Sequence, residues 1–189
     1  MESFLVSTGV VAIAEIGDKT QLLALLLAAR FRKPVAIIAG IFIATVANHT
    51  LAAWVGTLAA ELLSADVMRW VLGLSFIAMS AWALVPDKVD DEPRQYGHFG
   101  AFLATVVAFF LLEMGDKTQI ATVALAARFD NVLWVAMGTT LGMMIANVPA
   151  VLLGDAVTKR VSLKLVRIIA ALIFAVIGVL TLLNVGAFF

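Results

Sequence analysis

Cysteine is absent from this chain of 189 residues, and histidine occurs only twice, as His49 and His98. The lack of cysteine excludes disulfides and thiolate metal sites, and a zinc or copper site would be expected to recruit more histidine. Charged residues make up 14% of the sequence and their formal sum is zero, so attraction to nucleic acid is not indicated.

Apolar residues, in contrast, are abundant: 63% of the chain is hydrophobic and the mean hydropathy is +1.06. This composition indicates an all-α integral membrane protein whose surroundings are the lipid bilayer. Six spans of about 20 residues use most of the length, so a soluble catalytic domain has no room. The start Met1-Glu2-Ser3 lacks the basic region of a cleaved signal peptide, and the first segment is expected to remain as a span. The predicted transmembrane helices are 4–29, 35–58, 67–85, 99–127, 132–156 and 165–185.

The two halves of the chain repeat each other at a constant offset of 98 residues. The matching pairs are Glu15 and Glu113, Gly17 and Gly115, Asp18 and Asp116, Gly40 and Gly138, Arg69 and Arg167, and Phe76 and Phe174. Residues 1–85 and 99–189 therefore form two three-helix repeats, joined by the polar linker 86–98. Because each repeat has an odd number of crossings, the second enters the membrane from the opposite side, which gives an inverted-topology repeat.

The distribution of Lys and Arg predicts the orientation. Nine of these residues fall on one side of the predicted spans and only Arg69 and Arg128 on the other. The nine are Arg30, Arg32, Lys33, Lys88, Arg94, Lys159, Arg160, Lys164 and Arg167. Positive charge favours the cytoplasm, which places the linker inside the cell and both termini outside the cytoplasm. The acidic linker is interpreted as a plain solvated loop, with a cation-attracting or regulatory segment as the alternative.

Two nearly identical motifs lie in the middle of the first span of each repeat. They read Glu15-Ile16-Gly17-Asp18-Lys19-Thr20-Gln21 and Glu113-Met114-Gly115-Asp116-Lys117-Thr118-Gln119. Carboxylates inside a membrane segment are expensive and indicate a functional site. On a continuous helix the two acids of each motif share a face, and Lys19 and Lys117 follow their glutamates at a favourable spacing. The predicted metal ligands are Glu15, Asp18, Glu113 and Asp116, and the two lysines would balance part of their charge.

The charge of this group indicates what it binds. Four acids and two lysines leave a net charge of −2, which one divalent cation would neutralise. Clustered carboxylates in a low dielectric also favour proton binding, so protons and metal would compete for the site. Carboxylates are hard oxygen donors suited to manganese, calcium or magnesium. Possible auxiliary ligands are Thr20, Gln21, Asn48, Thr118, Gln119 and Asn147, with His49 a weaker candidate.

Each of these features can also be explained by a role in the structure alone, without ion binding. The motif charges could form salt bridges that only join two helices, although the lysines would neutralise only half of the acids. An interhelical hydrogen bond would explain Asn48 or Asn147. Gly17 and Gly115 either open the helix at the site or make room for a neighbouring helix. Small residues recur every four positions from Gly40 to Gly56 and from Gly138 to Gly154, which permits close helix packing or sliding against the motif helices.

Together, the motifs and their positions resemble the Gdt-type cation/proton exchanger family, which includes Golgi and chloroplast manganese/calcium transporters and bacterial manganese exporters. The resemblance covers essentially the whole chain, and both Glu-x-Gly-Asp-Lys-Thr motifs are intact. It implies a six-span inverted-repeat fold and ion binding by Glu15, Asp18, Glu113 and Asp116. The compact chain is similar to the bacterial members, which implies manganese export across the inner membrane.

The leading hypothesis is thus a secondary transporter that exchanges manganese for protons and needs no cofactor. Calcium/proton exchange by the same mechanism is one alternative, and an uncoupled cation channel is another. A membrane-embedded enzyme such as a lipid-phosphate hydrolase is disfavoured, because such a site should present arginines to phosphate whereas this one is acidic.

Overall fold

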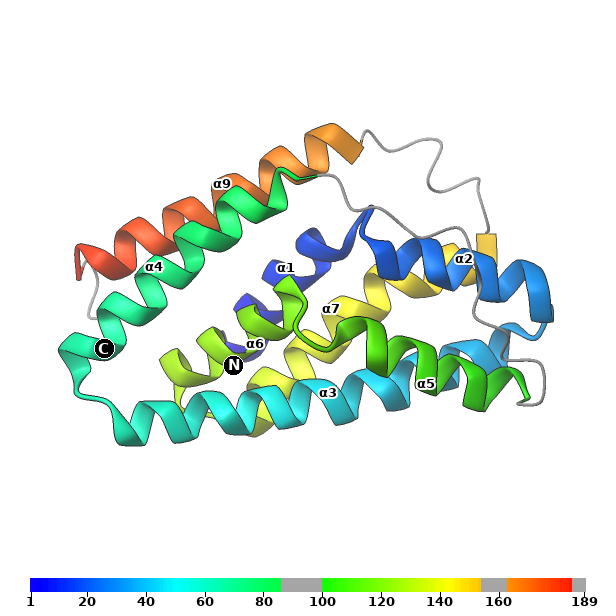
Figure 1. Cartoon of the computed structure of the whole chain (residues 1–189), viewed down its shortest axis with the longest axis horizontal. Coiled ribbons are helices and arrows are strands. Elements are labelled where there is room, and N and C mark those ends of the chain that lie inside the picture. Colours follow the sequence, from blue (N-terminus) through cyan, green and yellow to red (C-terminus); the bar gives the residue numbers. More distant parts are fainter. Residues whose placement is uncertain (86–99, 154–162, 185–189) are drawn as a thin grey trace.

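The first apolar segment of the chain is broken in the middle rather than crossed by one helix (Figure 1). The computed structural model describes residues 1–85, 100–153 and 163–184. The segment predicted as 4–29 forms α1 (Glu2–Glu15) and α2 (Lys19–Phe31), and the segment predicted as 99–127 forms α5 (Ala101–Glu113) and α6 (Lys117–Phe129). Both predicted spans are thus interrupted at their motif glycines.

Glycine explains both breaks. Gly17 has a φ of 79° and Gly115 a φ of 76°, a left-handed conformation that costs glycine little and other residues more. A side-chain carbon added at Gly115 would meet no atom within 4 Å. The glycine there opens the helix, as one of the two interpretations predicted, and does not make room for a neighbour.

Every other element among the described residues is also a helix. They are α3 (Pro34–Leu62), α4 (Ala65–Ala83), α7 (Val132–Leu153) and α9 (Leu163–Leu182). Within the described ranges, three segments are long and apolar enough to cross a membrane, namely Pro34–Leu62, Val132–Leu153 and Lys164–Leu182. This agrees with a helical membrane protein. The predicted linker 86–98, with His98, lies outside the described residues, and so does Gly154, the last of the regularly spaced small residues of the second half.

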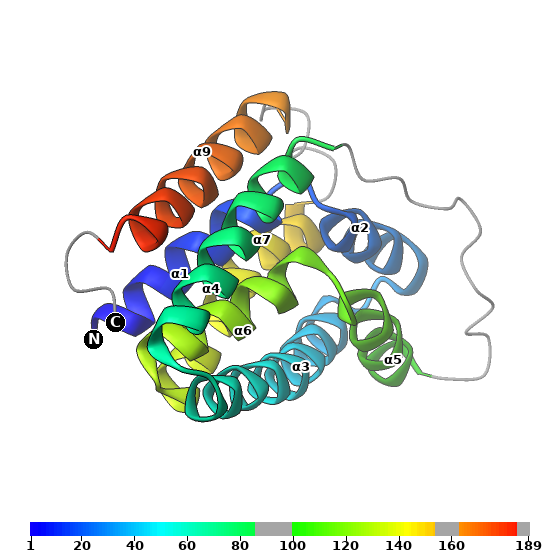
Figure 2. The same cartoon turned by 60° about the vertical axis from the view of Figure 1, so that its left-hand side comes forward.

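The long helices α3 and α7 run side by side along the molecule, and the broken helices lie against them (Figures 1 and 2). α1 packs on α7, and α5 and α6 pack on α3. α1 and α5 approach their breaks from opposite ends of the molecule (Figure 1). Each break is therefore placed beside the long helix of the other half of the chain.

Glycines on α3 and α7 allow this close approach. A carbon added at Gly142 would lie 2.7 Å from the carbonyl oxygen of Thr8 on α1, and one at Gly40 would lie 2.7 Å from Cβ of Thr105 on α5. Both distances are too short for two packed atoms, so no larger residue fits without a shift of the helices. The regularly spaced small residues of α3 and α7 therefore give the predicted close packing against the motif helices.

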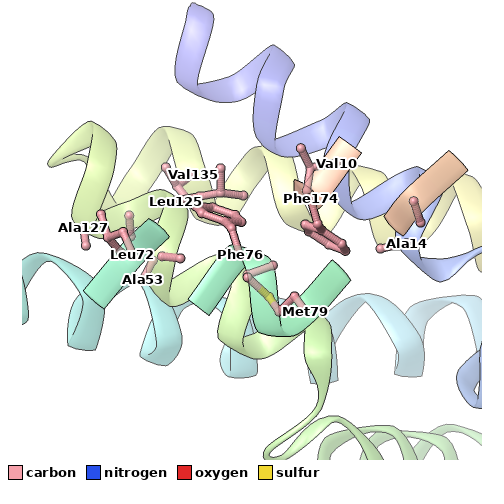
Figure 3. Packing of buried hydrophobic residues seen from close by; sticks show 14 of the residues in the cluster. Val10, Ala14, Ala53, Leu72, Phe76, Met79, Leu125, Ala127, Val135 and Phe174 are labelled. Atoms are coloured by element: carbon pink, nitrogen blue, oxygen red, sulfur yellow. The ribbon is translucent and has the colours of Figure 1, made fainter. Parts of the chain in front are cut away.

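A second layer is formed by α4 and α9, which lie antiparallel beside each other (Figures 1 and 2). The rings of Phe76 and Phe174 stack at 6.3 Å, and Met79 and Leu125 pack around them (Figure 3). The pair packs on α6 and α1, whereas its contact with α2 and α5 is at most slight among the described residues. The layer of α4 and α9 thus covers α1 and α6 but leaves α2 and α5 largely uncovered among the described residues.

We expect Gly142→Ala to destabilise the protein by about 1–3 kcal/mol, the usual cost of overpacking a tight contact. The thermal unfolding midpoint in detergent measures the effect. Gly9→Ala is the matched control, because a carbon at Gly9 of α1 meets no atom within 4 Å. An equal loss of stability in both variants would contradict this account of the α1–α7 contact.

Candidate cation site

The two carboxylates of each motif lie on opposite sides of a helix break. Glu15 is the last residue of α1, and Asp18 caps the start of α2. The backbone N–H of Asp18 donates to the carbonyl of Glu15 at 3.1 Å, and Asp116 donates to Glu113 at the same distance. The expected shared helix face does not exist, because the chain leaves the helix between the two acids. In the second motif, the turn leaves a carboxylate oxygen of Glu113 within 4.8 Å of one of Asp116.

Each turn is held by the glutamine that ends its motif. The side-chain oxygen of Gln21 accepts the N–H of Gly17 at 3.0 Å, and that of Gln119 accepts the N–H of Gly115 at 2.6 Å. The same amide groups donate across the molecule: Gln21 donates to the carbonyl of Ala146 on α7 at 2.9 Å, and Gln119 donates to the Asn48 side chain on α3. In this arrangement the glutamine oxygens face the backbone, so these residues position the turns.

Both glutamates are buried, and each has one oxygen engaged. Thr20 Oγ1 donates to Glu15 Oε2 at 2.5 Å, and Thr118 Oγ1 donates to Glu113 Oε2 at 2.9 Å. The other oxygen of each glutamate, Oε1, has no hydrogen-bond partner among the described residues. A buried acceptor without a partner is costly, and a cation or a proton would satisfy it.

Three of the four predicted ligands form one cluster. Glu15, Glu113 and Asp116 each offer an oxygen, and these oxygens all lie within 4.8 Å of one another. All three residues are buried. Oxygen donors at this separation suit a hard divalent cation. Asp18 does not belong to this cluster in the structure, and its carboxylate contacts Lys117.

The lysines pair across the two motifs rather than within them. Lys19 Nζ lies 2.8 Å from Asp116 Oδ1, and Lys117 Nζ contacts Asp18 Oδ1. The helical spacing had favoured contacts with Glu15 and Glu113, but the break turns each lysine towards the other motif. The Lys117 side chain is 6% exposed and that of Lys19 is 22% exposed. The two motifs are thereby joined by two crossed ion pairs.

Polar residues of α3 and α7 lie around this centre. Asn48 Nδ2 donates to the carbonyl of Phe110 at 3.3 Å, and the Asn48 side-chain oxygen accepts from Gln119. Asn48 thus forms the interhelical hydrogen bonds that its structural explanation predicts. Asn147 Nδ2 donates to the carbonyl of Met143 at 3.1 Å, while its side-chain oxygen has no hydrogen-bond partner within residues 1–85, 100–153 and 163–184. His49 is fully buried, and neither ring nitrogen has a hydrogen-bond partner in the part of the chain that the structure describes.

Buried carboxylates at paired helix breaks, inside an apolar helical protein, are features expected of a membrane cation transporter. The family model described as "Divalent cation/proton antiporter GDT1" matches residues 3–91 and 101–187. The chain belongs to this family, as its motifs predicted, and the family is one of transporters rather than enzymes.

Individual relatives agree with this assignment. A Vibrio cholerae protein named "Putative manganese exporter" is 51% identical over 182 residues, which cover 96% of this chain and 90% of that protein. "GDT1-like protein 3" of Oryza sativa subsp. indica is 28% identical over 200 residues, covering 92% and 71%. A GDT1-like protein of Synechocystis is 28% identical over 193 residues, covering 90% and 92%. No solved structure matches the chain.

We expect Lys117→Met to destabilise the protein by about 3–5 kcal/mol, because it leaves the buried Asp18 carboxylate without its ammonium partner. Lys19→Met should cost less, since Lys19 is the more exposed of the two. Thermal unfolding of both variants in the same detergent measures the difference. A larger loss in Lys19→Met would show that the two ion pairs do not differ as the structure indicates.

Proposed function

We propose that this protein exports manganese ions from the bacterial cytoplasm across the inner membrane in exchange for protons. The observation that carries the proposal is the buried cluster of Glu15, Glu113 and Asp116, whose oxygens lie within 4.8 Å of one another. Family membership supports the exchange of a divalent cation for protons. The printed name of the Vibrio relative supports manganese as the cation.

The proposed architecture is six spans in two inverted repeats, 1–85 and 99–189, in which α1 with α2 and α5 with α6 form the two broken spans. The paired contacts support this arrangement, because each has an equivalent 98 residues away. Lys19 reaches Asp116 as Lys117 reaches Asp18, and Gln21 reaches residue 146 as Gln119 reaches residue 48. In the proposed orientation both termini lie outside the cytoplasm.

The charges of the site account for the exchange. Each lysine neutralises one aspartate, so the two glutamates supply the remaining charge of −2. One divalent cation, or the protons that replace it, would neutralise that charge in the membrane interior. In the proposed cycle the carboxylates bind manganese from the cytoplasm, the repeats rearrange, and protons displace the ion on the other side.

The test uses purified protein in proteoliposomes with a manganese-quenched dye and an imposed pH gradient. We expect manganese flux that follows the gradient and is lost in Glu113→Gln, which removes a ligand charge from the cluster. Glu61→Gln is the matched control, because Glu61 is exposed at the end of α3.

Each outcome decides between the alternatives. Near-normal exchange in Glu113→Gln would refute the assignment of the site. Flux that ignores the pH gradient would indicate a channel instead of an exchanger. Flux with calcium but not with manganese would retain the mechanism and change the transported ion.

A further inference from the structure

A small cavity adjoins the first helix break on the side where α4 ends and α9 begins. Its volume is about 10 Å³, roughly the space of one water molecule. Asp18 and Lys117 line it from the site, Ala83 from α4, and Val166, Arg167 and Ala170 from α9. The cavity thus connects an ion pair of the site with the start of α9, and it is too narrow for a hydrated divalent cation.

Arg167 is the charged residue that α9 contributes to this cavity. It is half-buried and forms no salt bridge with any carboxylate among the described residues. The equivalent residue of the first repeat, Arg69, is paired with Asp66 at 3.2 Å. Within the described part of the chain, the Arg167 guanidinium therefore lies beside the cavity without a salt-bridge carboxylate.

The second break is less covered by the described residues. Met114, the equivalent of the cavity residue Ile16, is 56% exposed. α9 packs on α1, whereas the corresponding contact of α4 with α5 is at most slight in the described part of the chain. The two breaks have equivalent local geometry but unequal surroundings among the described residues, and Arg167 lines the cavity beside the first break.

We propose that Arg167 is a gating residue, which closes the passage between Asp18 and the membrane face where α9 begins. This inference rests on the proposed function. A guanidinium stays charged under all physiological conditions, and its field in a narrow, low-dielectric passage repels an approaching divalent cation. Arginine at this place prevents cations from reaching the site without the exchange cycle. Because α9 is packed on α4, the charge would move with both helices when the passage opens.

A flux measurement tests the gate. Proteoliposomes are assayed for manganese flux without a pH gradient, relative to flux with one. We expect Arg167→Gln to raise this leak ratio about tenfold, which corresponds to a barrier lower by about 1.4 kcal/mol. Arg167→Lys keeps the charge and should remain close to the unmodified protein. Lys164→Gln is the matched control, since it removes an exposed charge one turn earlier on the same helix.

A labelling measurement tests the same gate without transport. The chain contains no cysteine, so Ile16→Cys introduces a single thiol at the cavity. Its reaction rates with a cationic and a neutral methanethiosulfonate of similar size are compared. We expect the cationic reagent to be disfavoured in the Ile16→Cys protein and in its Lys164→Gln derivative, and this discrimination to be lost in its Arg167→Gln derivative.

The outcomes separate the gate from the proposed function. An unchanged leak ratio together with unchanged reagent discrimination in Arg167→Gln would overturn the gate, even if the unmodified protein exchanges manganese for protons. Absence of gradient-driven manganese flux in the unmodified protein would refute the proposed function. In that case the labelling result alone would support or overturn the gate.

Discussion

The structure depends on two lysine–aspartate pairs that join the motifs across the two halves of the chain. In an apolar interior, a single buried charge is expensive and a well-paired one is tolerated. Each lysine begins the helix that follows its own break, yet its partner belongs to the other break. Moving either break away would separate these ion pairs at a cost in free energy, which favours holding both breaks at one place. This constraint brings Glu15 and Glu113 together.

The helix breaks provide the site with helix ends, which a continuous helix does not have at this place. α1 and α5 end at the site, where the last carbonyls of a helix carry partial negative charge and favour a cation. Left-handed glycines make the turns, and Gln21 and Gln119 satisfy the freed glycine N–H groups. Unsatisfied backbone groups are costly at membrane depth, so these glutamines allow an irregular backbone inside an apolar protein.

The sequence predicted the composition of the site better than its geometry. Charge inside apolar segments identified both motifs, and their glycines indicated helix opening. The crossed pairing of Lys19 and Lys117 could not be predicted, because helical spacing assigns each lysine to its own motif and only the break redirects it. The Gln119–Asn48 contact joins residues 71 positions apart, and local patterns do not encode such contacts. The unequal cover of the two breaks, including Arg167, was also beyond prediction, because it depends on how α4 and α9 pack against segments that are far away in the sequence.

The most direct test of the account is the binding of manganese to the purified protein, followed by the EPR signal of free Mn²⁺ during a titration. A single site shared by both halves predicts one bound ion per chain, which is lost in Glu15→Gln and equally in Glu113→Gln. Binding that survives the loss of either glutamate, or that depends on only one half of the chain, would contradict the shared site.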